Sequence, residues 1–118
     1  MEIQERTVGA ATILDLKGKL TFGDGDTLLK EKVRSLVNRG CKQLVLNLAE
    51  LPYIDSVGIG EIVGTYTTMT RVHGSLKLLN VPKRIHDLLV ITKLLTLFET
   101  FDTEAEAVRT SFASGTKS

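Results

Sequence analysis

The sequence predicts an α/β fold, a single domain in which a small mixed β-sheet packs against about four α-helices. Apolar positions follow strand and helix spacing in turn along the chain, which is typical of strands joined by crossover helices. The segment from Gln43 to Leu48 is almost continuously apolar, as in a central strand covered on both faces. With 118 residues, one core suffices, and we expect the domain to comprise residues 1–112 and a flexible C-terminal tail residues 113–118.

The N-terminal part of the chain predicts two strands and a helix. Residues 3–8 are a weak edge-strand candidate, and residues 12–17 alternate as in a strand with one better-buried face. Residues 9–10 are expected to join them as a hairpin. An apolar helical stripe follows, made of Leu29, Val33, Leu36 and Val37. Acidic residues before this stripe and Gly40 after it suit the two ends of a helix.

The middle of the chain predicts a strand, a turn and a second helix. The strand from Gln43 to Leu48 is followed by a turn from Ala49 to Ile54, which contains Pro52. A helix begins near Val57 and is closed by Gly74. Its apolar stripe is expected to be Ile59, Ile62, Val63, Tyr66, Met69 and His73.

The C-terminal part predicts a strand from Leu76 to Leu79, a helix with Pro82 in its first turn, and a short strand from Leu97 to Phe101. A last helix is expected at Thr103, which forms an S/T-x-x-E capping box with Glu106. The apolar face of this last helix is expected to be Ala105, Val108 and Phe112.

Composition and charge exclude several classes of protein. The chain has 15 Lys+Arg against 14 Asp+Glu and a net charge of +1, which argues against a general nucleic-acid-binding protein. The single cysteine, Cys41, excludes an intrachain disulfide and favours a reducing, cytoplasmic setting. The sequence has neither the pattern of a signal peptide nor the roughly 20 apolar residues that span a bilayer.

Two loops at the carboxyl ends of predicted strands are candidate sites, because ligands and partners of such sheets meet these ends. They are residues 18–25 and residues 51–58, and in the second loop Asp55 and Ser56 stand where a helix begins. The simpler interpretation makes both residues helix caps, which contribute about 1 kcal/mol. The alternative makes Ser56 a phosphorylation switch: a helix N-terminus favours an anion, and a phosphate adds about −1.5 to −2 charges beside Asp55.

Catalytic, cofactor and metal sites are not expected. Residues 58–60 begin like a G-x-G-x-x-G dinucleotide loop, but the sixth position is Val63. Ser56 lies in no G-x-S-x-G elbow, and neither histidine, His73 or His86, has an evident reason to meet it. The two histidines and the cysteine lack the spacing of metal ligands. An enzyme or nucleotide-binding role requires a pocket that the sequence does not reveal.

The segment from Asp55 to Gly60, preceded by the apolar strand from Val45 to Leu48, resembles the STAS family, named for sulfate transporters and anti-sigma factor antagonists. It looks most like the free-standing bacterial anti-sigma factor antagonists. The similarity covers nearly the whole chain, from the strand pair and Gly18-Lys19-Leu20 to the segment from Thr103 to Ala107. The resemblance implies a STAS-like fold.

The resemblance also implies partner switching. In the family, the unphosphorylated antagonist binds an anti-sigma factor that is a serine kinase and thereby frees a sigma factor. The kinase phosphorylates the serine after the Asp, here Ser56, and a PP2C-type phosphatase resets the protein. The partner-binding residues are expected to be Thr21, Phe22, Gly23, Asp24, Asp55, Ser56, Val57, Gly58, Ile59 and Gly60. We expect no direct nucleic-acid binding, no membrane insertion, and a monomer or weak dimer.

Two positions depart from the family pattern. Val57 stands where the family often has Ser or Thr, and Thr21 follows Leu20 where antagonists commonly carry an acidic residue. The second departure favours an alternative function, a non-phosphorylated STAS scaffold or adaptor in a larger regulatory or lipid-transport complex. Phe22 is expected to be either an exposed anchor for a partner or a core plug under its loop.

Overall fold

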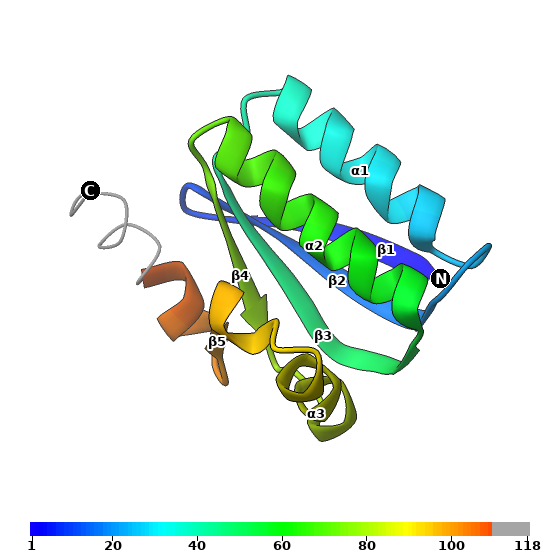
Figure 1. Cartoon of the computed structure of the whole chain (residues 1–118). Coiled ribbons are helices and arrows are strands. Elements are labelled where there is room, and N and C mark those ends of the chain that lie inside the picture. The colour runs from blue at the N-terminus through cyan, green and yellow to red at the C-terminus, as the bar shows by residue number, and fades with distance from the viewer. Residues whose placement is uncertain (110–118) are drawn as a thin grey trace.

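The protein is a mixed β-sheet with helices on both faces (Figure 1). The structure is a computed structural model and describes residues 1–109. The elements are β1 (Glu2–Val8), β2 (Ala11–Leu20), α1 (Asp26–Asn38), β3 (Gln43–Ile54), α2 (Ser56–Arg71), β4 (Ser75–Leu79), α3 (Lys83–Ile91), the short 3-10 helix η1 (Leu95–Leu97) and β5 (Glu99–Phe101). A further helical segment covers residues 104–109.

The five strands lie in the order of the sequence, from β1 at one edge to β5 at the other. Strand β1 pairs antiparallel with β2 through a hairpin that brings Val8 opposite Ala11, and the remaining neighbours are parallel. The prediction of a mixed, largely parallel sheet is therefore confirmed. Parallel neighbours require crossover connections, and the helices that the sequence places between the strands provide them.

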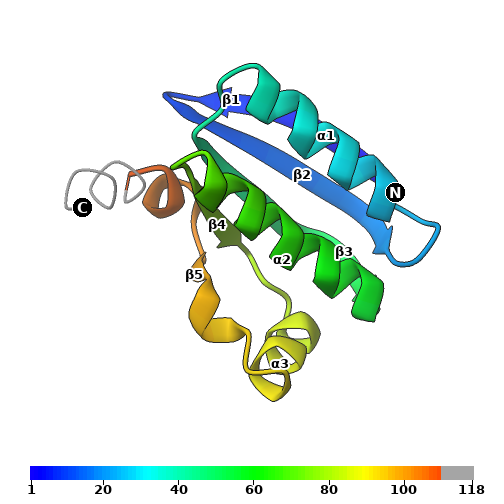
Figure 2. The ribbon, with the colours of Figure 1, turned by 45° about the horizontal axis from the view of Figure 1, so that its top comes forward.

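Helices α1 and α2 lie side by side on one face of the sheet, with their N-termini at the same end (Figure 2). The main core fills the space between them and the sheet, and α3 packs against the same core from one end. Its buried members include Leu14, Leu16, Val33, Leu36, Leu44, Leu46, Leu48, Ile59, Ile62, Met69, Leu76, Leu78, Ile85 and Leu89. The predicted stripes of the first two helices are thus largely confirmed.

A smaller apolar cluster lies on the opposite face, against residues 104–109. Its buried members are Ile13, Val45, Leu79 and Ala107. Successive residues of a strand point to opposite faces, so Val45 belongs to this cluster while Leu44 and Leu46 belong to the main core. Strand β3 is therefore covered on both faces, as its sequence predicts.

The predicted turn from Ala49 to Ile54 is wrong, because β3 continues to Ile54. The ladder between β3 and β4 ends at the pair Asn47 and Leu79, and the register between β2 and β3 shifts at two places. Pro52 lies in this irregular part of the strand, where a missing N–H is tolerated. The longer strand carries the start of α2 to the end of the sheet.

Helix α2 ends differently from the prediction. The left-handed residue that follows it is His73, with φ 61, and not Gly74. His73 is exposed and leaves the apolar stripe on which it was predicted. Gly74 is needed for a close approach: a Cβ there would lie 2.6 Å from the carbonyl oxygen of Lys42.

The last strand is shorter than predicted. The expected strand from Leu97 to Phe101 divides into η1 and β5. The cap predicted at Thr103 is confirmed, since its hydroxyl oxygen accepts a hydrogen bond of 3.3 Å from the N–H of Glu106. The predicted apolar face is wrong in one member: Ala105 is exposed, whereas Ala107 is buried against the sheet. Phe112, the predicted domain end and the predicted tail lie outside the described residues.

No helix within residues 1–109 is long and apolar enough to cross a membrane.

Candidate functional site

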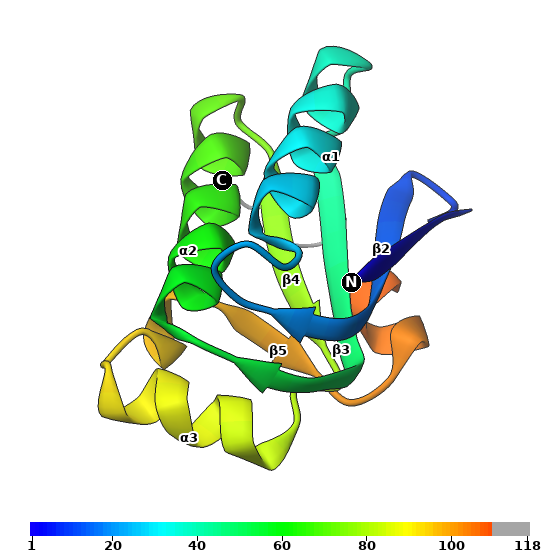
Figure 3. The ribbon, with the colours of Figure 1, turned by 90° about the vertical axis from the view of Figure 1, so that its right-hand side faces the viewer.

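The two candidate loops meet at one end of the molecule, where the loop of residues 21–25 lies beside the start of α2 (Figure 3). The loop follows β2 and the helix follows β3. These strands are adjacent and parallel, and their last residues, Leu20 and Ile54, are paired in the ladder. Since parallel strands end at the same edge of a sheet, the two segments come together as the sequence predicts.

Asp55 connects the two segments. It is the N-cap of α2, where its Oδ1 accepts a hydrogen bond of 2.9 Å from the N–H of Gly58. Its Oδ2 accepts a second bond of 3.0 Å from the N–H of Phe22 in the neighbouring loop. These N–H groups, that of Gly58 foremost, hold the pKa of the Asp55 carboxyl below its usual value. The capping interpretation is confirmed for Asp55, whereas Ser56 is the first residue of the helix.

Gly58 brings the first turn of α2 into contact with the sheet. A Cβ at this position would lie far inside van der Waals contact with the carbonyl oxygen of Leu20 and 2.6 Å from Cγ1 of Ile54. The glycine therefore serves close packing of the helix on the end of β2. Gly60 lies on the exposed side of the same turn, where a Cβ would meet no atom within 4 Å.

The loop of residues 21–25 is held by backbone and side-chain bonds. Thr21 and Asp24 exchange two backbone hydrogen bonds of 2.8 and 3.0 Å. The N–H of Gly23 donates to Oδ1 of Asp26 at 3.1 Å, and the terminal ammonium of Met1 lies 3.0 Å from Oδ1 of Asp24. These contacts, together with the bond from Phe22 to Asp55, give the loop a defined position.

Phe22 lies at the tip of this loop with 78% of its surface exposed. The interpretation of Phe22 as a core plug is therefore wrong. An aromatic side chain presented in this way by a bonded loop is a candidate contact for a protein partner.

Ser56 and Val57 are both exposed at the start of α2. The Ser56 hydroxyl makes no hydrogen bond with any residue from 1 to 109 and is open to solvent. Gly58 and Ile59, which the sequence also predicts as partner-binding residues, are buried. They lie beneath the exposed surface and position it.

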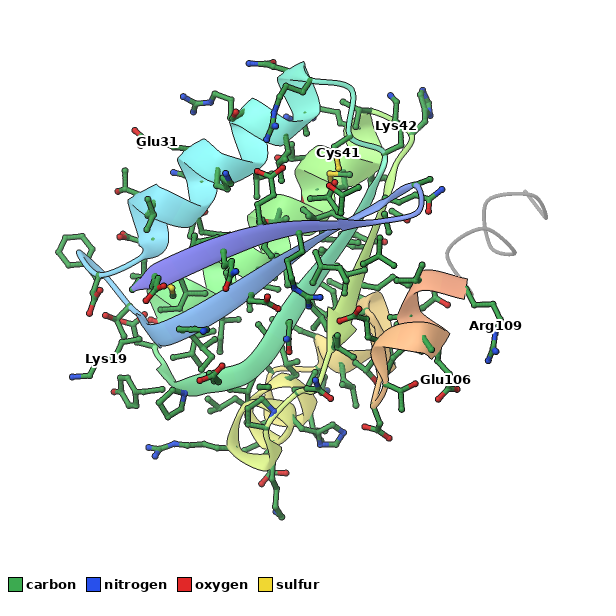
Figure 4. The ribbon with its side chains drawn as sticks, turned by 180° about the vertical axis from the view of Figure 1, so that it is seen from behind. Lys19, Glu31, Cys41, Lys42, Glu106 and Arg109 are labelled. Atoms are coloured by element: carbon green, nitrogen blue, oxygen red, sulfur yellow. The ribbon has the colours of Figure 1, made fainter. Side chains whose placement is uncertain are left out.

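Two further residues at this end were not predicted as site residues. Tyr53, at the end of β3, is 41% exposed, and the guanidinium of Arg84 in α3 lies 5.4 Å from its ring centroid. Their contact joins residues 31 positions apart, and no sequence pattern links them. Lys19 pairs with Tyr53 across the ladder, and Figure 4 shows its side chain extending into solvent at this end of the sheet.

No group of three potential metal-ligating side chains lies together in the part of the chain that the structure describes.

Comparisons with known proteins agree with this architecture. A family model described as the STAS domain matches residues 2–107. The anti-sigma F factor antagonist of Paenibacillus polymyxa is 28% identical over 96 residues, which cover 81% of this chain and 82% of that protein.

Two solved structures of the anti-sigma factor antagonist SpoIIAA share the fold. The unphosphorylated form superposes with a TM-score of 0.70 at 21% identity, covering 92% of this chain and 96% of that one. The phosphorylated form, from Bacillus, gives a TM-score of 0.73 at 22% identity and covers 92% and 97% of the two chains.

Proposed function

Because this chain belongs to the STAS domain family, we propose that it is an anti-sigma factor antagonist that acts by partner switching. With Ser56 unphosphorylated, the protein binds an anti-sigma factor that is also a serine kinase, and a sigma factor is released. Phosphorylation of Ser56 by that kinase ends the interaction, and a PP2C-type phosphatase restores it. The relative named above is an anti-sigma factor antagonist, which supports a regulatory binding role in place of an enzymatic one.

The observation that carries this proposal is the position of the Ser56 hydroxyl. It is exposed, has no partner within residues 1–109, and stands next to the ionised carboxylate of Asp55. A kinase can therefore reach the hydroxyl without unfolding the helix. The surrounding exposed side chains include Phe22 and Val57, which suit contact with a protein.

The arrangement also supplies a physical mechanism for release. Asp55 already accepts hydrogen bonds from the N–H groups of Gly58 and Phe22, so these donors are not free for a phosphate on Ser56. The phosphate would remain hydrated while the protein is free. A partner that covers Ser56 must remove that water, which costs several kcal/mol unless a cation meets the phosphate. A change of about 5.5 kcal/mol suffices to take binding from nearly complete to nearly absent.

The proposed partner surface consists of the exposed residues around this hydroxyl. Phe22 is its apolar anchor, because aromatic side chains that enter a partner's pocket carry a large share of binding energy. Val57 and Gly60 extend the surface along α2, and Thr21, Gly23, Asp24 and Asp55 support the loop that presents Phe22. Gly58 and Ile59 contribute from beneath.

A direct test is phosphorylation by the partner itself. Ser56→Ala serves as bait to capture the anti-sigma factor from the native cell, and the purified kinase is then incubated with ATP and the wild-type chain. We expect intact-mass measurement to show one added phosphoryl group on the wild type and none on Ser56→Ala. An unmodified wild-type chain would contradict the proposal.

The alternative function is a non-phosphorylated scaffold or adaptor in a larger regulatory or lipid-transport complex. Thr21, in place of an acidic residue, is the observation that favours it. The turn is held by backbone bonds between Thr21 and Asp24, and these bonds do not depend on which side chain stands at position 21. A chain that binds its partner stably, and that the captured kinase does not phosphorylate, would support the scaffold.

A further inference from the structure

A groove with a volume of about 360 Å³ runs between α1 and α2, away from the sheet. Its apolar wall is formed by Val33 and Val37 of α1, and its opposite wall includes Gly64 and Thr68 of α2. The lining of the groove begins at Lys30 and Glu61, about one turn beyond the first residues of α1 and α2. Both helices start at the end of the molecule that carries the candidate site (Figure 2). By helical spacing, Val57, beside Ser56, lies on the same side of α2 as Gly64, seven residues further on.

The walls of this groove repeat at intervals of four residues. Residues 33 and 37, 34 and 38, and 64 and 68 all line it. Four residues rise about 6 Å along a helix, and a helix laid in the groove would present its own side chains at the same interval. Gly64 leaves room for such a side chain, since a Cβ there would meet no atom within 4 Å.

The groove also carries positive charge without a local counterpart. Lys30 and Glu61 form an ion pair of 3.4 Å across it. Arg34, one turn beyond Lys30, is exposed and makes no hydrogen bond or ion pair with any residue from 1 to 109. A guanidinium beside the two valines of the groove suits a carboxylate on an occupant that also presents aliphatic side chains.

We propose that this groove receives an amphipathic helix of the protein that binds at Ser56, with aliphatic side chains over Val33, Val37 and Gly64 and a carboxylate at Arg34. The inference rests on the proposed function, because the occupant is the same anti-sigma factor. It assigns this partner a second region of contact, continuous with the one around Ser56.

The test uses the purified anti-sigma factor captured with Ser56→Ala. Arg34→Glu reverses the free charge, and Gly64→Leu fills the groove. Each is expected to weaken binding by at least about tenfold. The matched controls are Arg71→Glu and Thr70→Leu, exposed positions of α2 outside the groove, for which we expect no more than about a twofold change. Circular dichroism and urea unfolding of every variant establish that the fold is retained.

A photo-crosslinking amino acid at Thr68 identifies the occupant. It is expected to crosslink to an acidic, helical segment of the anti-sigma factor, whereas the same group at Thr70 is not. A crosslink to a second copy of the chain would overturn the inference, as would equal binding by the groove variants and the wild type. If the wild type does not bind the anti-sigma factor at all, both the proposed function and this inference fail, whereas normal binding by the groove variants overturns only the inference.

Discussion

The carboxylate of Asp55 accepts a hydrogen bond from the backbone N–H of Phe22, 33 residues earlier in the chain. This bond ties the loop that carries the exposed ring of Phe22 to the start of α2, where Ser56 is exposed. The same carboxylate caps α2 through Gly58. One side chain therefore fixes both the start of the helix and the loop next to it, and substitutions at Asp55 separate these two roles.

Asp55→Asn is expected to keep the capping bond from Gly58 and to lose the bond from the N–H of Phe22 that holds the loop. An asparagine oxygen caps a helix about as well as a carboxylate, but the amide nitrogen cannot accept from Phe22. Asp55→Ala loses both bonds, and its free energy of unfolding should fall by about 0.5–2 kcal/mol, more than that of Asp55→Asn. Urea unfolding measures the stability, and amide hydrogen exchange at Phe22 measures the loop. Unchanged exchange in both variants would show that this bond does not hold the loop.

Gly58→Ala and Gly64→Ala are expected to have effects of opposite sign. Alanine stabilises a helix by about 1 kcal/mol relative to glycine. At Gly64 the added Cβ meets no atom within 4 Å, so the gain should appear as increased stability. At Gly58 the Cβ overlaps the carbonyl oxygen of Leu20, and such overpacking costs about 1–3 kcal/mol. Urea unfolding of both variants provides the comparison; equal gains would contradict the close approach at Gly58.

Phe22→Ala is expected to affect binding and not stability. The ring is 78% exposed, so the free energy of unfolding should change by no more than about 0.5 kcal/mol. Affinity for the captured anti-sigma factor should fall by at least about tenfold. Ile91→Ala is the matched control, because Ile91 is 75% exposed on α3. If the two variants bind equally well, Phe22 is not the anchor.

Acid should destabilise the protein partly through Asp15. The Arg6 side chain, and after it Asn47, hydrogen-bond this carboxylate and hold the pKa of Asp15 below its usual value. Because the pKa of Asp15 is lower in the folded state, its ionisation stabilises the fold at pH values above its pKa in the unfolded chain, about 3.9. This stabilisation is lost as the pH falls through the pKa of the folded state.

Asp15→Asn should therefore show a shallower loss of stability than the wild type between about pH 4 and pH 2. The measurement is urea unfolding at a series of pH values. Asp102→Asn is the control, because Asp102 is exposed and has no ion pair with the rest of residues 1–109. If the free energy of unfolding of Asp15→Asn falls with decreasing pH as steeply as that of the wild type, Asp15 makes no such contribution.

Local patterns in the sequence predict the elements that depend on nearest neighbours. The stripe from Leu29 to Leu36, the apolar strand at Val45 and the cap at Asp55 all require only residues within a few positions of one another. The meeting of the two candidate loops follows as well, because adjacent parallel strands end together.

Features that depend on distant segments could not be predicted in the same way. Pro52 suggests a turn, and only the early end of the β3–β4 ladder explains why a strand continues through it. The burial of Ala107 instead of Ala105 depends on how the last helix meets Ile13 and Val45. The packing of Arg84 on Tyr53 and of the Met1 ammonium on Asp24 has no local signal.

The most direct test of the phosphorylation switch is the affinity of Ser56 variants for the anti-sigma factor, measured by isothermal titration calorimetry. Ser56→Ala should bind about as tightly as the unphosphorylated wild type, because the hydroxyl makes no hydrogen bond within residues 1–109. Ser56→Asp, and more strongly the phosphorylated wild type, should bind far more weakly, because a charge must be desolvated beside Asp55. Equal affinities for Ser56→Ala, Ser56→Asp and the phosphorylated chain would contradict the account.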